Sequence, residues 1–269
     1  MRGKLLGPTL ALAAFMLSAI TGLPSPAKAE TEVDLALVLA VDVSYSMDPD
    51  EQRLQREGFI EAFRSGVVQE AIRSGMLGRI AVVYMEWAGA AHQQVVVPWT
   101  VVDGREAAAA FADRLAGTPT GRAFWTSVSG AIEAGARLMG MSGVTAERRV
   151  IDVSGDGPNN QGRVVTAARD EAVAAGITIN GLPILMKRGT SAWDIPDLDL
   201  YYRDCVIGGP RAFMVPVRER EEFAKAIRTK LVMEIAGLAP PEPLIRQAQS
   251  EARANCLVGE MQRRRSSDN

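Results

Sequence analysis

Residues 34–51 read D-L-A-L-V-L-A-V-D-V-S-Y-S-M-D-P-D-E and pass from an apolar run through a polar loop into the start of a helix. The apolar run before Asp42 is typical of a strand buried on both faces of a parallel sheet. Asp48 is a good N-cap, Pro49 suits the first helical position, and Glu51 stands where a capping box needs an acid. The stretch therefore predicts a strand followed directly by a helix, as in a βαβ unit.

The same alternation of apolar runs and helical patterns continues along the chain. We expect strands over residues 79–87, 94–99, 149–154, 177–185 and 212–217, and helices over 103–115, 126–139, 164–175 and 220–235, with Asp103 as the cap of the 103–115 helix. Pro98 would interrupt a central ladder, so the 94–99 strand, in a hairpin with 79–87, is placed at an edge. The patterns predict a three-layer α/β fold that is Rossmann-like and doubly wound, with a mostly parallel sheet and one antiparallel edge strand.

The first residues have the composition of an export signal. The basic start M-R-G-K precedes an apolar stretch from Leu10 to Ile20, and Ala27-Lys28-Ala29 fits the small-x-small cleavage rule. Residues 1–29 are therefore predicted to be a signal peptide, and the mature protein is expected in the periplasm or secreted. An uncleaved anchor helix is the alternative. No later stretch is long and apolar enough to predict a membrane span.

About 240 residues remain after the leader, which suits one α/β domain over residues 34–237 followed by a C-terminal tail over 238–269. The leader holds three of the 30 Lys and Arg residues and none of the 32 Asp and Glu residues, so the remaining chain has a net charge of −5. A mildly acidic chain argues against nucleic acid as the partner. The closing Q-R-R-R-S-S-D-N is expected to be a solvated terminus.

The chain has two cysteines, Cys205 and Cys256. In an oxidising compartment, two cysteines that are far apart in sequence and have no histidine nearby more often form a disulfide than bind a metal. We therefore expect one disulfide, through which the C-terminal tail packs back onto the domain. Two unpaired thiols are the alternative.

Polar side chains follow two of the expected strands. Asp42, Ser44 and Ser46 come after the first strand, and Asp156 comes after the 149–154 strand. Ligands of open parallel sheets bind at the carboxyl ends of the strands, so these side chains are expected at one site. The following helix already has its own cap, so capping does not account for them. A carboxylate and two hydroxyls at alternate positions form an all-oxygen set, which a hard cation such as Mg²⁺ prefers.

These residues carry a resemblance to a family. D-V-S-Y-S-M resembles the metal-ion-dependent adhesion site of von Willebrand factor type A (vWA) domains, whose pattern is D-x-S-x-S. W-T-S-V-S-G-A-I, with Thr126, resembles the second loop of that site, and V-I-D-V-S-G-D-G-P-N resembles its fourth strand and T-D-G, with Gly155 in place of the usual Thr. With its leader and its Y-Y-R-D-C-V-I-G-G-P segment, the chain is similar to an exported bacterial branch of the family, from which no activity can be carried over.

The resemblance implies a bound divalent cation, either Mg²⁺ or else Mn²⁺ or Ca²⁺. Its ligands would be Ser44, Ser46 and Thr126, with Asp42 and Asp156 acting directly or through water. If Thr126 is only a helix cap, the neighbouring Thr120 is the substitute ligand. The resemblance also implies a function: an adhesion-type module in which the cation binds a carboxylate offered by a partner protein.

Two other functions remain open: an envelope scaffold with a purely structural metal, and a metal-assisted hydrolase. A Ser-His-Asp hydrolase would need a histidine, and the only one is His92. We expect His92 on the surface of the hairpin turn, away from the strand ends that carry Asp42 and Asp156. The sequence offers no other obvious base, so we expect a binding protein and not an enzyme.

Further expectations concern polar and aromatic residues around the site. Asp152, inside a strand, is interpreted as a paired polar position on the sheet. Asn159 and Asn160 are expected to shape the loop after that strand. The four tryptophans are expected in the core.

Overall fold

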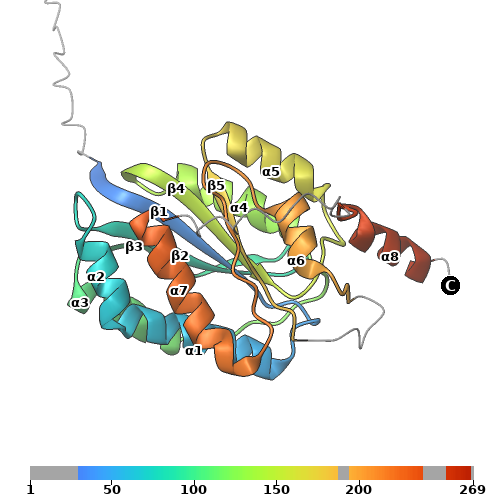
Figure 1. Ribbon diagram of the computed structural model, residues 1–269, viewed down its shortest axis with the longest axis horizontal. Coiled ribbons are helices and arrows are strands. Elements are labelled where there is room, and N and C mark those ends of the chain that lie inside the picture. The colour runs from blue at the N-terminus through green and yellow to red at the C-terminus, as the bar shows by residue number, and fades with distance from the viewer. Residues whose placement is uncertain (1–29, 187–193, 239–252, 268–269) are drawn as a thin grey trace, which may run out of the picture.

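The computed structural model describes residues 30–186, 194–238 and 253–267 (Figure 1). The expected signal peptide, residues 1–29, lies outside these ranges. Within them, no helix combines the length and the apolar character that crossing a membrane requires. The centre is a five-stranded sheet in the order β3-β2-β1-β4-β5. Its strands are β1 (Thr31–Asp42), β2 (Ile80–Trp87), β3 (Gln93–Val102), β4 (Val144–Gly155) and β5 (Thr178–Pro183).

The sheet is parallel except at one edge. β1 pairs in parallel with both β2 and β4, β4 pairs in parallel with β5, and β3 runs antiparallel to β2. Pro98 lies in β3, where an edge strand tolerates a residue without a backbone N–H. The mostly parallel sheet with one antiparallel edge strand is the fold class that the sequence predicts.

Helices cover both faces of the sheet, which gives three layers (Figure 1). One face carries α1 (Pro49–Arg64), α2 (Gly66–Arg73), α3 (Arg105–Ala116) and α7 (Phe223–Ala236), and the other carries α4 (Val128–Gly140), α5 (Val165–Ala174) and α6 (Leu198–Tyr201). Along β1, alternate side chains enter the two cores: Leu35, Leu37 and Leu39 pack against the first set of helices, and Ala36, Val38 and Ala40 against the second. A strand buried on both faces explains the unbroken apolar run in the sequence.

The helix starts show where local sequence decides structure. At α1 the capping box is present: the backbone N–H of Glu51 donates to Asp48 at 2.8 Å, and that of Asp48 donates to Glu51 at 2.8 Å. The expected cap of α3 is wrong, because Gly104 occupies the N-cap position and no side chain of the described residues caps the helix. The α2 helix, which the sequence did not predict, begins with its own cap at Ser65.

The expected strand over residues 212–217 is also wrong. This segment runs beside β5 and joins it through isolated bridges at Met214 and Val217. The ladder is interrupted by a side chain, because the backbone N–H of Phe213 donates to the Asn180 amide oxygen at 3.1 Å. A polar residue inside β5 thus replaces part of the regular pairing.

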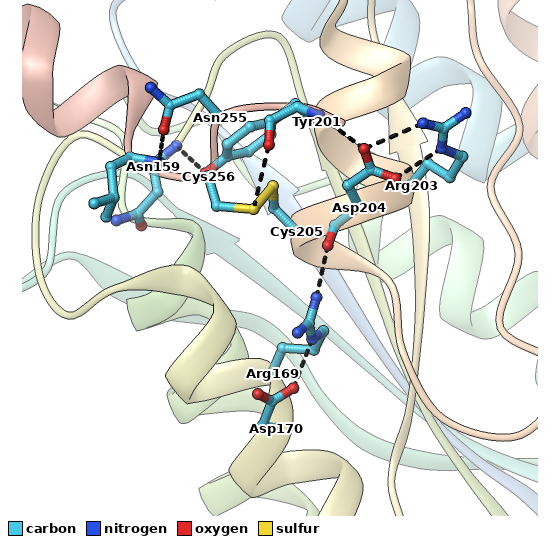
Figure 2. The surroundings of a disulfide bond; sticks show 11 residues. Asn159, Arg169, Asp170, Tyr201, Arg203, Asp204, Cys205, Asn255 and Cys256 are labelled. Atoms are coloured by element: carbon cyan, nitrogen blue, oxygen red, sulfur yellow. Dashed lines mark hydrogen bonds and ion pairs between the residues drawn. A yellow bond between two sulfur atoms is a disulfide. The ribbon is translucent and has the colours of Figure 1, made fainter. Parts of the chain in front are cut away.

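Cys205 and Cys256, the pair expected from the sequence, form a disulfide, with their Cα atoms 5.5 Å apart (Figure 2). Cys205 lies in a π-helical segment, Tyr202–Val206, and Cys256 lies just before α8 (Val258–Ser267). The backbone N–H of Ala254 also donates to the carboxylate of Asp204 at 2.8 Å. The C-terminal helix, which the sequence did not predict, is therefore fastened to the domain at its amino end.

Candidate metal centre

Asp42 ends β1 at the edge of the sheet where the parallel strands finish. Its side chain is fully buried. One carboxylate oxygen, Oδ1, accepts a hydrogen bond from the backbone N–H of Ser44 at 2.7 Å. The other, Oδ2, has no hydrogen-bond partner among the described residues. A buried carboxylate oxygen without a donor is costly, so this atom is poised to bind something that the protein itself does not supply.

Hydroxyl groups join the loop after β1, which begins at Asp42, to the loop after β4. The Oγ atoms of Ser44 and Ser46 lie 2.7 Å apart, and the Ser46 hydroxyl donates to Oδ1 of Asp156 at 2.7 Å. The structure therefore brings Asp42, Ser44, Ser46 and Asp156 together, although Asp156 lies far from the others in sequence. The four side chains offer oxygen atoms only.

Thr126 reaches the same edge from a third loop, just before α4. Its side chain is buried. Asn160 binds both the N–H and the carbonyl of Thr126: Thr126 N–H donates to the Asn160 amide oxygen at 2.9 Å, and Asn160 N–H donates to the Thr126 carbonyl at 2.8 Å. Asn159 fixes the start of α4 by accepting from the backbone N–H of Ser129 at 2.9 Å. These bonds confirm that the two asparagines shape the loop. Thr120, the substitute ligand, is exposed, so burial favours Thr126.

The electrostatics of the site favour a cation. The pKa of Asp42 is raised well above its usual range, first because the carboxyl is buried and second because Asp156 is close, while hydrogen bonds from Ser44 and from the backbone of Asp156 act in the opposite direction. Among the described residues, no Lys or Arg side chain forms an ion pair with Asp42. No three Asp, Glu, His or Cys side chains of the described ranges cluster as a metal site, so two carboxylates and the hydroxyls would have to suffice. This donor set fits a hard divalent cation that keeps some of its water.

Gly155 departs from the Thr of the vWA pattern, and the structure gives a reason. A Cβ atom at this position would lie 2.7 Å from Oδ2 of Asp42 and 3.2 Å from the hydroxyl of Tyr202. The Tyr202 hydroxyl in turn faces the Gly155 carbonyl at 3.5 Å. Only glycine leaves room for both the carboxylate and the phenol. Tyr202 belongs to the Y-Y-R-D-C segment, which thus packs against Gly155 next to the site.

Sequence reasoning missed the residues that hold the loop before Thr126. Arg56 of α1 forms a buried ion pair with Glu86 of β2 and donates to the backbone carbonyl of Thr118 at 2.6 Å. Glu86 also accepts from the backbone N–H of Gly121 at 3.0 Å. In sequence, Arg56 and Glu86 look like any charged residues of a helix and a strand. A carboxylate within an apolar strand was the one signal that could have marked Glu86.

His92 lies in the turn between β2 and β3, and two parts of its expected placement are wrong. The turn follows the carboxyl end of β2, and Trp87 at that end pairs with Asp42, so the turn lies at the same edge of the sheet as the candidate site. The side chain is half-buried and not on the surface. The backbone of His92, not its ring, closes the turn, through hydrogen bonds with Ala88 and Gly89 at 3.0 and 2.9 Å.

Two expectations about large side chains are also wrong. Trp125 is 42% exposed, whereas Trp87 is buried in the core as expected. The closing basic segment is not simply solvated, because the Arg263 guanidinium lies over the Trp125 ring, 4.3 Å from its centroid. Aromatic content alone could not tell a core tryptophan from one beside a site.

Comparison with protein families decides the assignment of the chain. Residues 32–239, most of its length, match the family described as a protein of unknown function, DUF1194. The chain belongs to this family. None of the curated proteins compared with this DUF1194 member matches it.

Solved structures show that the fold of this DUF1194 member is that of a vWA domain. The vWF domain of the type V pili tip protein Mfa5 from Porphyromonas gingivalis is 12% identical, with a TM-score of 0.50; the match covers 78% of this chain and 98% of that chain. The von Willebrand factor type A protein from Catenulispora acidiphila is 16% identical, with a TM-score of 0.50, over 76% of this chain and 43% of that chain.

A third structure is similar at the same level. Proximal thread matrix protein 1 from the mussel byssus, with a zinc-occupied MIDAS motif, is 12% identical, with a TM-score of 0.52, over 77% of this chain and 49% of that chain. The match thus spans about half of the thread protein. At these identities the likeness establishes the fold and not the activity.

Proposed function

We propose that this protein is an exported module that binds a partner protein through a divalent cation held by the candidate metal centre. The observation that carries the proposal is the buried Asp42 carboxylate, whose Oδ2 has no hydrogen-bond partner among the described residues although Asp156 is close and two serine hydroxyls link the loop after Asp42 to Asp156. Two carboxylates brought together in a partly dry site repel each other, so a bound cation would relieve the repulsion.

Each residue of the site has a distinct part in this proposal. Ser44, Ser46 and Thr126 offer neutral hydroxyl oxygens, while Asp42 and Asp156 offer charge, directly or through water. Because few of the ligands are charged, a cation such as Mg²⁺ held here would keep attraction for a carboxylate from a partner. The hydrogen bonds that the side chain and the backbone of Asn160 form with the Thr126 backbone hold the Thr126 loop in place before any ligand binds.

Binding is better supported than catalysis. Acyl transfer needs a base within hydrogen-bond reach of its nucleophile, and within the part of the chain that the structure describes the His92 side chain makes no hydrogen bond that would orient it as one. Solved structures with a similar fold include the pilus adhesin SpaC from Lactobacillus rhamnosus GG and the tip protein of type V pili, which supports adhesion outside the cytoplasm for this chain too. The expected leader supports export.

Thermal melts test the metal directly. With Mg²⁺ about a hundredfold above its Kd, the Tm of the purified protein should rise by about 5–10 °C, because a cation that binds only the folded state stabilises it by mass action. Asp42→Ala should abolish the rise. Asp103→Ala, an exposed acid near the far end of β3, is the matched control and should keep it. A full rise in Asp42→Ala would overturn the proposal.

A second measurement separates a binding module from a scaffold with a structural metal. In a scaffold, the cation would raise the Tm but would attract no free carboxylate. In a binding module, acetate or a short acidic peptide should bind the Mg²⁺ form and not the EDTA-treated form, which calorimetry can follow. Raised Tm without any metal-dependent carboxylate binding would leave the scaffold as the function.

A further inference from the structure

Three large side chains are exposed in the loops that carry the candidate ligands. Tyr45, between Ser44 and Ser46, is 47% exposed; Phe124 and Trp125, just before Thr126, are 69% and 42% exposed. The rings of Tyr45 and Phe124 are stacked, with centroids 4.3 Å apart. We name these three residues the aromatic rim. Exposed apolar surface that is clustered, and not scattered singly, marks interaction sites.

Two guanidinium groups lie over rings of the aromatic rim, one over Tyr45 and one over Trp125. Arg122 lies over the Tyr45 ring, 4.6 Å from its centroid, and Arg263 lies over the Trp125 ring, 4.3 Å from its centroid. Arg122 also donates to the Met47 carbonyl at 3.0 Å, so its side chain is anchored in the first loop. The rim thus presents flat apolar rings and positive charge side by side, on a chain that is acidic overall.

Arg263 reaches the rim because α8 is held against the loop after β4. The Asn159 side chain donates to Glu260 at 2.7 Å, and Arg263 donates to the Asn160 carbonyl at 3.3 Å. Gly259 allows the close approach, since a Cβ there would lie 2.1 Å from the Asn159 carbonyl oxygen. In Figure 1, α8 (red) lies at the end of the molecule toward which β1 runs. The disulfide before α8 fixes the amino end of the helix (Figure 2).

The backbone at Trp125 is strained. Its φ of 72° lies in the left-handed region, which non-glycine residues with large side chains rarely adopt. The neighbouring Thr126 is buried while Phe124 and Trp125 stay exposed. Strain of this kind is kept where the surrounding structure has a use for it, such as a ligand clamp.

We propose that the aromatic rim docks an acidic, extended segment of the partner protein. The proposal rests on the proposed metal-dependent function and deepens it. One carboxylate of the segment goes to the cation, an apolar side chain next to it packs on Phe124 and Tyr45, and a second carboxylate pairs with Arg122 or Arg263. Arginine forks bind carboxylates in two-pronged hydrogen bonds, and aromatic residues with arginine dominate the binding energy of protein interfaces.

Peptide selection tests this chemistry without knowledge of the natural partner. Random dodecapeptides displayed on phage are selected on the purified protein in Mg²⁺ and eluted with EDTA. We expect enrichment of peptides in which two Asp or Glu residues flank an aromatic or branched aliphatic residue. Enrichment of acidic residues without an apolar neighbour, of basic peptides, or of nothing at all would overturn the proposal.

Variants then locate the contact. For a synthetic peptide of the selected sequence, Phe124→Ser should raise the Kd at least about tenfold, as for other central aromatic contacts. Met76→Ser removes an even more exposed apolar side chain, 88% exposed, at the far end of the sheet and should leave the Kd unchanged. Arg263→Glu should raise the Kd of a peptide with two acids more than the Kd of a peptide with a single acid. Arg265→Glu, on the same helix, should leave both Kd values unchanged. Equal Kd values for Phe124→Ser and wild type would overturn the proposal.

Metal binding by the same variants separates the two proposals. Phe124→Ser and Arg263→Glu should bind Mg²⁺ as the wild type does in calorimetry, because neither residue supplies an oxygen ligand. If the wild type binds no Mg²⁺, the proposed function fails. If it binds Mg²⁺ but selects no acidic and apolar peptides, only the role of the aromatic rim fails.

Discussion

Two pairs of acidic side chains lie in and beside the same sheet, and a buried lysine forms ion pairs with both acids of one of them. Asp152 of β4 and Glu234 of α7 are buried together, and the ammonium of Lys230 forms ion pairs with both, at 2.5 Å from Asp152. At the strand ends, Asp42 lies near Asp156, and no basic side chain of the described residues pairs with Asp42.

The difference teaches which pair is structural. In the buried cluster, Glu234 Oε2 also has no hydrogen-bond partner among the described residues, but Lys230 supplies a positive charge to both acids and the Asn180 amide donates a hydrogen bond to Glu234 at 2.9 Å. Asp42 at the strand ends forms no ion pair with a described Lys or Arg side chain, and its buried Oδ2 has no hydrogen-bond donor among the described residues. The first pair can be expected to hold α7 on the sheet, and the second to accept a cation from solution.

The largest expected effect comes from removing the internal cation. Lys230→Met leaves two buried carboxylates facing each other and should lower the free energy of unfolding by about 3–5 kcal/mol in urea denaturation. The triple variant with Asp152→Asn and Glu234→Gln removes the repulsion and should recover part of the loss. A loss under about 1 kcal/mol in the single variant would show that the two pairs are not different in kind.

Neutralising one acid of each pair should have opposite effects in metal-free protein. Asp152→Asn removes a partner of Lys230 and should destabilise by about 1–3 kcal/mol. Burial disfavours the charged form of both acids, but Asp42 has no ion pair with a described basic side chain to offset it, so Asp42→Asn should stabilise at neutral pH by about 1 kcal/mol. Urea unfolding in EDTA measures both. Destabilisation by both variants would argue that Asp42 already has its counter-charge.

These pairs also show what the sequence could predict. Asp152 was expected as a paired polar position, and the ion pair with Lys230 confirms this. Its partner could not be named, because Lys230 occupies an ordinary position in a helix pattern and only the packing of α7 on the sheet buries it. The side chains at the strand ends were easier to predict, because Asp42 and the serines follow a strand directly and the parallel order of the sheet fixes where that strand finishes.

The parts that the sequence did not predict depend on contacts between distant segments. The α8 helix has little apolar pattern of its own, and its place follows from the disulfide and from the Asn159 and Asn160 loop. The exposure of Trp125 likewise depends on the left-handed backbone before Thr126. The ligands themselves remain a prediction until a metal is measured.

The pH dependence of stability should be moderate and should come in part from the internal cluster. Burial, followed by the charge of Asp152, raises the pKa of Glu234 from 4.5 to about 7. Between these values Glu234 binds more protons in the folded state than in the unfolded state, so the stability that Glu234 contributes should be fully present below pH 4.5 and should be lost as the pH rises through 7. In Glu234→Gln this fall should be shallower, as urea midpoints across the range would show. An identical slope in wild type and variant would mean that Glu234 keeps its ordinary pKa.

The smallest effect on the free energy of unfolding is expected at Tyr202, whose hydroxyl lies beside Gly155 next to the candidate metal centre. Its hydroxyl lies 3.5 Å from the Gly155 carbonyl, which is long for a hydrogen bond, and burial followed by the charge of Asp42 raises its pKa, so it stays neutral. Tyr202→Phe should therefore change the free energy of unfolding by less than about 0.5 kcal/mol. Gly155→Ala, whose Cβ would lie 2.7 Å from Asp42 and 3.2 Å from the Tyr202 hydroxyl, should cost more and should be partly relieved when combined with Tyr202→Phe. Strict additivity of the two changes in urea unfolding would show that the phenol is not what limits position 155, and would leave the Asp42 carboxylate as the sole reason for glycine there.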